Sequence, residues 1–209
     1  MRAMSVEASP MLSASLEAAE TAKTKNIIEM AFDFTAMMWL FAKGSPAKIH
    51  HKLETAFAGL GSIREQKDYD LMHADFCGWF TQNIDRAQKK KQRESGAAIR
   101  KSSYGQAAKV IDIAAKVYVY YCALPSRESA QVLIPLLHGA LDNQIVKHLT
   151  QKFPETRIKS KQLEDIDRPK YEQLQSLVGR EIREDFNSEI LPVQYDDILF
   201  RRLNRTSAS

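Results

Sequence analysis

Apolar residues recur in this chain at the spacing of an α-helix almost from end to end. In 25–44 the members of one apolar stripe are three or four residues apart over several turns, the period that places side chains on one helix face. The same spacing is found in 67–84, 104–123 and 169–185. Strict alternation of the kind that a half-buried strand shows is confined to 117–121, inside a helical pattern. The sequence therefore predicts an all-α fold, an irregular bundle of six to seven helices with no significant sheet.

The boundary between the first two predicted helices is marked by three residues. Gly44 is suited to end the first helix, because glycine tolerates the backbone conformation that follows a helix C-terminus. Ser45 and Pro46 are suited to begin the second, since serine is a favoured N-cap and proline fits the first helical turn. The first helix, 25–44, and the fourth, 104–123, carry the widest apolar faces, so we predict that these two are central in the bundle.

The length of 209 residues suits one domain or two small ones. We expect a single helical domain over 21–203, which could divide near 153–168, where the apolar pattern weakens. It is flanked by a mobile N-terminal segment, 1–20, which has no apolar stripe to hold it. A loose polar tail, 204–209, follows the last helix.

Cysteine usage and the absence of targeting signals indicate a cytoplasmic protein. Cys77 and Cys122 form no CxxC pair and no cluster with histidine, so we expect two reduced thiols and no structural zinc site or other cofactor. The N-terminus has no apolar core of the signal-peptide type. The apolar run 107–124 is interrupted by Lys109, Asp112 and Lys116, which argues against a membrane span and a membrane partner.

The motifs of common enzymes are missing, which argues against catalysis. The chain has no GxxxxGK[ST], GxGxxG, GxSxG or HExxH. One set of candidate catalytic residues remains: His73, His138 and Asp142. His138 and Asp142 are four positions apart, and Asp70 precedes His73 by three, so each pair would share a helix face. A metal-assisted or acid–base hydrolase using these residues is an alternative function; the pattern favours two hydrogen-bonded histidines packed between helices, because polar pairs at this spacing arise often by chance.

Basic residues are concentrated in one segment, 86–101, which carries a net charge of +6 while the whole chain carries +4. Four of them recur every three to four positions and would share a face if the third helix extended that far. No aromatic residue follows until Tyr104, so base stacking within the segment is weak. A DNA- or RNA-binding protein is thus an alternative function, and a solvated loop is the other interpretation. The seven basic residues are Arg86, Lys89, Lys90, Lys91, Arg93, Arg100 and Lys101.

The first predicted helix is apolar on two sides. Phe32, Trp39 and Leu40 lie opposite its main stripe, and a helix apolar nearly all round needs two covering surfaces. A second copy of the chain could supply one of them through these three residues; complete burial within one chain is the alternative. The function that we predict first is therefore a non-enzymatic helical interaction protein that forms a homodimer.

Overall fold

A computed structural model describes residues 10–88, 94–159 and 162–206 of the chain. The described residues contain eight α-helices and no strand, which confirms the predicted all-α bundle. No helix among them is long and apolar enough to cross a bilayer. The helices are α1 (Pro10–Phe34), α2 (Ser45–Ala58), α3 (Gln66–Asn83), α5 (Tyr104–Ala115), α6 (Arg127–Leu133), α7 (Asn143–Lys152), α8 (Arg168–Phe186) and α9 (Pro192–Thr206).

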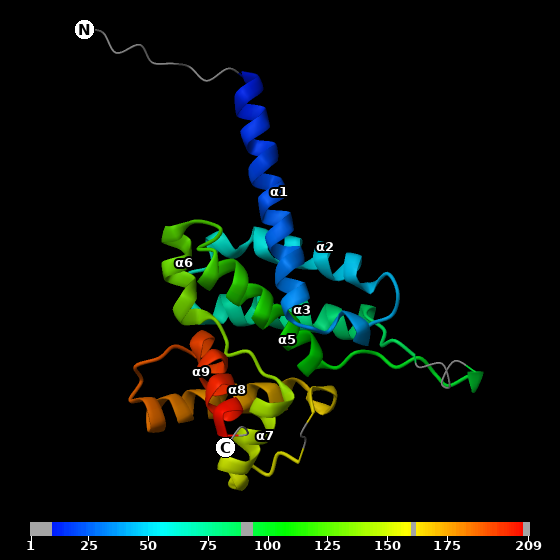
Figure 1. Cartoon of the computed structure of the whole chain (residues 1–209), viewed down its shortest axis with the longest axis vertical. Coiled ribbons are helices and arrows are strands. Elements are labelled where there is room, and N and C mark those ends of the chain that lie inside the picture. Colours follow the sequence, from blue (N-terminus) through cyan, green and yellow to red (C-terminus); the bar gives the residue numbers. More distant parts are fainter. Residues whose placement is uncertain (1–9, 89–93, 160–161, 207–209) are drawn as a thin grey trace.

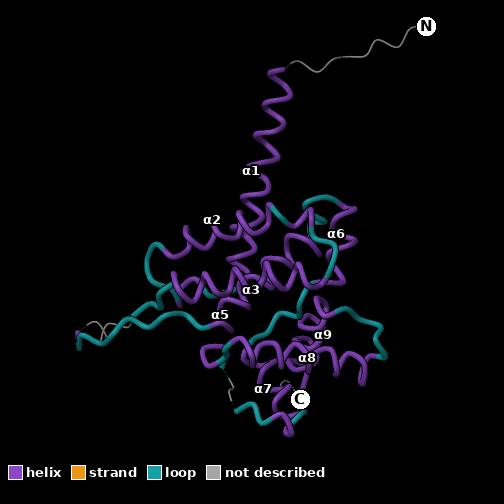
Figure 2. Tube along the Cα trace, turned by 180° about the vertical axis from the view of Figure 1, so that it is seen from behind, coloured by secondary structure: helices purple, strands orange, loops and turns teal. Residues whose placement is uncertain are grey.

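Helix α5 lies at the centre of the bundle, as the sequence predicted. It packs against α1, α2 and α3 on one side and against α8 on another, and Figures 1 and 2 show α7, α8 and α9 grouped below it. Ala108 and Ala115 are buried in its interior turns, and such small side chains let neighbouring helices approach closely. Packing is closer still at Gly105, near the start of the helix, because an added Cβ there would lie 2.6 Å from the carbonyl oxygen of Leu163.

Helix α1 differs from the prediction at both ends. It begins at Pro10, inside the segment predicted to be mobile, and its exposed N-terminal half projects from the body (Figure 1). It ends at Phe34 instead of continuing to Gly44, because Thr35 turns the chain: its hydroxyl donates to the carbonyl of Phe32 and accepts from the amide of Met37. Only the C-terminal part of α1 is therefore central. Residues 1–9 and 207–209, at the ends of the predicted N-terminal segment and tail, lie outside the described residues.

Three extended segments meet beside the end of α3. The amide of Ala42 donates to the carbonyl of Asp85 at 2.9 Å, and that of Ala87 donates to Leu40 at 2.8 Å. On the other side, the amide of Arg86 donates to the carbonyl of Arg100 at 2.9 Å. These isolated bridges form no named strand in the described part of the chain. They place the turn after α1 directly against the basic segment.

Ion pairs of one buried lysine link α9 to the core. Lys116 is only 3% exposed, and its ammonium lies 2.8 Å from Asp196 and 2.7 Å from Asp197. Lys116 follows α5 in a π-helical turn, Lys116–Tyr121. Asp112 and Lys116, two of the charges that interrupt the apolar run 107–124, are both buried, and each pairs with a residue distant in the chain: Asp112 with His73 and Lys116 with Asp196.

Candidate functional site

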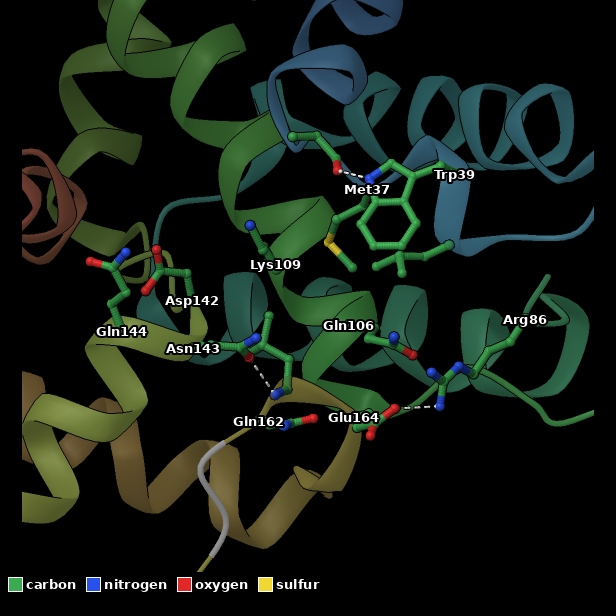
Figure 3. Close-up of a pocket in the computed structure, with 13 residues that line it drawn as sticks. Met37, Trp39, Arg86, Gln106, Lys109, Asp142, Asn143, Gln144, Gln162 and Glu164 are labelled. Atoms are coloured by element: carbon green, nitrogen blue, oxygen red, sulfur yellow. Dashed lines mark hydrogen bonds and ion pairs between the residues drawn. The ribbon is translucent and has the colours of Figure 1, made fainter. Parts of the chain in front are cut away.

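An exposed tryptophan forms one wall of a pocket of about 580 Å³. The Trp39 side chain is 76% exposed, and its indole nitrogen donates to the carbonyl of Ala36 at 2.9 Å, which fixes the orientation of the ring. Figure 3 shows the indole on one side of this pocket, with Lys109, Asp142 and Gln144 across from it. The pocket thus combines a flat aromatic face with polar side chains.

The polar wall of this pocket carries balanced charge. Arg86 forms an ion pair with Glu164 at one end (Figure 3). Lys109 and Asp142 lie at the other end; burial lowers the pKa of the Lys109 ammonium, and the charge of Asp142 acts in the opposite direction. Two cations and two carboxylates can therefore orient the polar edge of a ligand whose flat face lies on Trp39.

A second pocket of about 470 Å³ continues from Trp39 toward the basic segment. Trp39 and Leu40 line both pockets, and Gln88 and Arg100 line the second one. We call the two together the Trp39 groove. The sequence suggested that the basic segment lacked an aromatic partner, but the fold supplies one from the turn after α1.

The predicted nucleic-acid-binding residues are only partly placed by the structure. Lys89, Lys90, Lys91 and Arg93 lie outside the described residues. Lys101 pairs with Asp85 at 2.8 Å, while Arg100 lines the Trp39 groove. The shared helix face expected for Arg86 is wrong, because α3 ends at Asn83 and Arg86 lies in an extended segment.

The predicted interface residues separate from one another. Phe32 is fully buried within the chain, so its assignment to an interface is corrected. Leu40 is partly buried, and Trp39 alone is well exposed. The outer face of α1 is instead formed by Met30 and Phe34, which are 54% and 68% exposed. Both faces of this helix are apolar, so the sequence pattern did not show that the face of Phe32 is buried and the face of Met30 and Phe34 is exposed.

A second candidate site is a buried cluster of titratable side chains. His73 on α3 places its Nε2 3.1 Å from Oδ1 of Asp112 on α5. The Tyr171 hydroxyl, from α8, donates to both oxygens of Asp112 and lies 3.2 Å from the same histidine nitrogen. His138 places its Nδ1 3.0 Å from that hydroxyl. Four side chains from four parts of the chain thus meet at one point, and we call them the His–Asp–Tyr cluster.

The cluster reaches solvent through Asp70 and a pocket. Nε2 of His138 lies 2.9 Å from Oδ1 of Asp70, whose carboxylate is half exposed. The hydrogen bond from His138 holds the pKa of the Asp70 carboxyl below its usual value. A pocket of about 250 Å³, rimmed by Arg168 and Glu172, opens onto His73, His138 and Tyr171.

Burial keeps the tyrosine of this cluster protonated. It raises the pKa of the Tyr171 hydroxyl well above the usual value, and the nearby Asp112 carboxylate raises it further. A neutral hydroxyl can therefore donate to Asp112 while accepting from an imidazole. The arrangement can move a proton between the pocket and Asp112, or it can present several donor atoms to one ligand.

Two of the three candidate catalytic residues meet. The rings of His73 and His138 are 4.8 Å apart, but Asp142 lies elsewhere: its carboxylate caps α7 by accepting from the amide of Ile145 at 2.8 Å. His138 precedes α7 in a loop, so the expected helical pairing of His138 with Asp142 is wrong. Asp112 takes the expected place of Asp142. A lone carboxylate in an otherwise apolar helix was the signal for it.

Comparison with known proteins gives no match: no family model, no curated protein and no solved structure resembles the chain.

Proposed function

We propose that this chain binds single-stranded nucleic acid in the Trp39 groove. The observation that carries the proposal is the position of an exposed tryptophan against a segment of net charge +6. Proteins that bind single strands combine aromatic side chains, on which bases stack, with cations that follow the phosphate backbone. Trp39 supplies the first element and the basic segment, 86–101, the second.

The shape of the groove suits an unpaired strand. A base that stacks on the indole of Trp39 leaves its edge facing the polar wall, where the Gln144 amide offers both a donor and an acceptor. The backbone of the same strand continues past Arg100. A duplex hides its base faces, so it could use only the charges. We therefore expect single strands to bind more tightly than duplexes of equal length.

The experiment measures the binding of a labelled oligo(dT) or oligo(U) strand by fluorescence anisotropy, together with quenching of tryptophan emission. Trp39→Ala should weaken binding by about 5- to 150-fold, because stacking on an aromatic side chain contributes about 1–3 kcal/mol per base. Phe34→Ala is the matched control, since it removes an exposed aromatic ring that lines neither pocket of the groove. Equal binding by the parent and Trp39→Ala would contradict the proposal.

A second candidate function is the homodimeric interaction protein that the sequence favoured. The observation in its support is the exposed apolar face of α1, formed by Leu16, Met30 and Phe34. Solvent-exposed Met and Phe are typical of interface centres. Sedimentation analysis of Phe34→Asp would test it: a dimeric parent should become monomeric, while nucleic-acid binding through Trp39 stays intact. A parent that sediments as a monomer at high concentration would exclude this candidate.

A further inference from the structure

We propose that the His–Asp–Tyr cluster is a binding site for a divalent transition-metal ion of the zinc class. The ligands are Nε2 of His73, Nδ1 of His138, a carboxylate oxygen of Asp112 and the Tyr171 oxygen. This site shares no lining residue with the Trp39 groove, so it is independent of the function proposed above.

The spacing of the donor atoms fits four-coordinate geometry. Metal bonds of about 2.0–2.2 Å arranged as a tetrahedron place neighbouring ligand atoms about 3.3–3.6 Å apart. In the cluster, His73 Nε2 lies 3.1 Å from Asp112 and 3.2 Å from Tyr171. His138 Nδ1 lies 3.0 Å from Tyr171. The candidate ligand atoms of the two histidines and the aspartate all lie within 4.8 Å of one another. Small side-chain movements therefore suffice to surround an ion.

Contacts made by the ring nitrogens that face away from the cluster orient the two imidazoles toward its centre. Histidines that bind metals usually hold their other ring nitrogen on a carboxylate or a similar acceptor. His138 has its Nε2 on Asp70 at 2.9 Å, which leaves Nδ1 facing the cluster. His73 has its Nδ1 near the Cys77 sulfur at 3.8 Å, which leaves Nε2 facing the cluster. The orientation required of both ligands is thus built into the fold.

The charge of Asp112 gives the strongest support. Two other acids with little exposure have an ammonium partner: the buried Glu181 lies 3.4 Å from Lys152, and the partly buried Asp196 lies 2.8 Å from Lys116. Among the described residues, Asp112 has no lysine or arginine partner, only His73 and the Tyr171 hydroxyl. Buried charges in proteins are paired or bind metal ions. A bound cation would supply the positively charged partner that the Asp112 carboxylate lacks.

The donor set also narrows the choice of metal. Imidazole nitrogen with carboxylate and tyrosine oxygen suits Zn²⁺, Co²⁺ and Fe²⁺, whereas Mg²⁺ and Ca²⁺ prefer sites made of oxygen alone. The pocket beside His138 provides a path for the ion, since Asp70 at its edge is half exposed.

The test is a titration of the full chain, stripped of metal by a chelator, with Co²⁺. Four-coordinate Co²⁺ absorbs strongly in the visible range, so the site should give an intense band that saturates at one equivalent and is displaced by Zn²⁺. Zinc at about 100 times its dissociation constant should raise the melting temperature by about 5–10 °C. A parent protein that shows no such band would overturn the proposal.

Variants separate the ligands from the supporting residues. His138→Ala and Asp112→Asn should abolish the cobalt band, and Asp70→Asn should weaken binding by about 10- to 100-fold. His51→Ala is the matched control, because its side chain is 83% exposed and far in sequence from the cluster. Asp112→Asn could fail to fold, which circular dichroism would reveal. In that case His138→Ala serves as the test of metal binding, because His138 lies in a loop and its replacement should leave the helices intact. Unchanged cobalt binding by His138→Ala, or its loss in His51→Ala, would overturn the proposal.

Discussion

The Tyr171 hydroxyl donates to both oxygens of Asp112, at 2.9 and 3.1 Å, and thereby joins α8 to the centre of α5. Asp112 needs such donors because the sequence places its carboxylate in α5, a helix whose residues are mostly buried. A buried acceptor that loses its donor costs the full penalty of desolvation. The contact between these two residues is therefore a structural support as well as part of a candidate site.

Replacing Tyr171 by phenylalanine should destabilise the metal-free protein by about 1–3 kcal/mol, because Asp112 then keeps only His73 as a donor. Chemical denaturation at neutral pH measures the change. Tyr121→Phe is the control: its hydroxyl also binds an aspartate, Asp197 at 2.8 Å, but the residue is exposed. That variant should stay within about 0.5 kcal/mol of the parent. If the two variants lose equal amounts of stability, the burial of Asp112 is not the cause of the loss in Tyr171→Phe.

Two glycines in helices should respond in opposite ways to alanine. Gly105→Ala should destabilise the protein by about 1–3 kcal/mol, since the new Cβ would lie 2.6 Å from the carbonyl oxygen of Leu163 and 2.7 Å from the Ile166 side chain. Gly78→Ala should stabilise it by about 0.5–1 kcal/mol, because no atom lies within 4 Å of the new Cβ and alanine favours a helix. Thermal unfolding of both variants compares them directly. A stabilising Gly105→Ala would mean that α5 is less tightly packed at its start.

Asp196 should make the stability depend on pH. Burial raises the pKa of this carboxyl from 3.8 to about 6, against the attraction of Lys116. The folded protein then holds a proton that the unfolded chain releases, so the free energy of unfolding should fall as pH rises from about 4 to about 6. Asp196→Asn should remove this part of the slope in urea denaturation. Asp33→Asn, which changes an exposed acid on α1, should leave the slope unchanged.

The sequence predicted the fold class well because helix periodicity is a local property. The starts of α2 and α8 follow from proline in their first turns, and both helices begin within about one residue of the expected position. The end of α1 could not be predicted, because it depends on side-chain bonds of Thr35 in a stretch whose apolar spacing continues unbroken. Two apolar faces also hid which side of α1 is buried.

The sites were harder to predict because their members are distant in the chain. His73 and His138 were identified by residue type, yet the carboxylate that binds His73 belongs to Asp112, 39 positions along the chain. Tyr171 falls within the predicted helix 169–185, and apolar spacing describes its buried ring but not its hydroxyl. Trp39 reaches the basic segment through backbone pairing of Leu40 with Ala87 and of Ala42 with Asp85, which no periodicity in the sequence indicates.

The last prediction separates the two components of nucleic-acid binding. Changing Lys89, Lys90, Lys91 and Arg93 to alanine removes four positive charges from the segment. For a single strand, every phosphate that the variant no longer neutralises should reduce the slope of log affinity against log salt by about 0.7, so the slope should fall by up to about 3. Trp39→Ala should lower the affinity at every salt concentration and leave the slope unchanged, since stacking releases no counterions.

The two changes should therefore combine additively in the fivefold variant, because one acts through charge and the other through stacking. Anisotropy titrations of the same oligo(dT) at several salt concentrations measure both quantities. The fold should survive, since Trp39 is exposed and the segment 86–101 carries few apolar residues. If the quadruple variant keeps the parent's slope, the segment makes no phosphate contacts, and nucleic acid is not the ligand of the Trp39 groove.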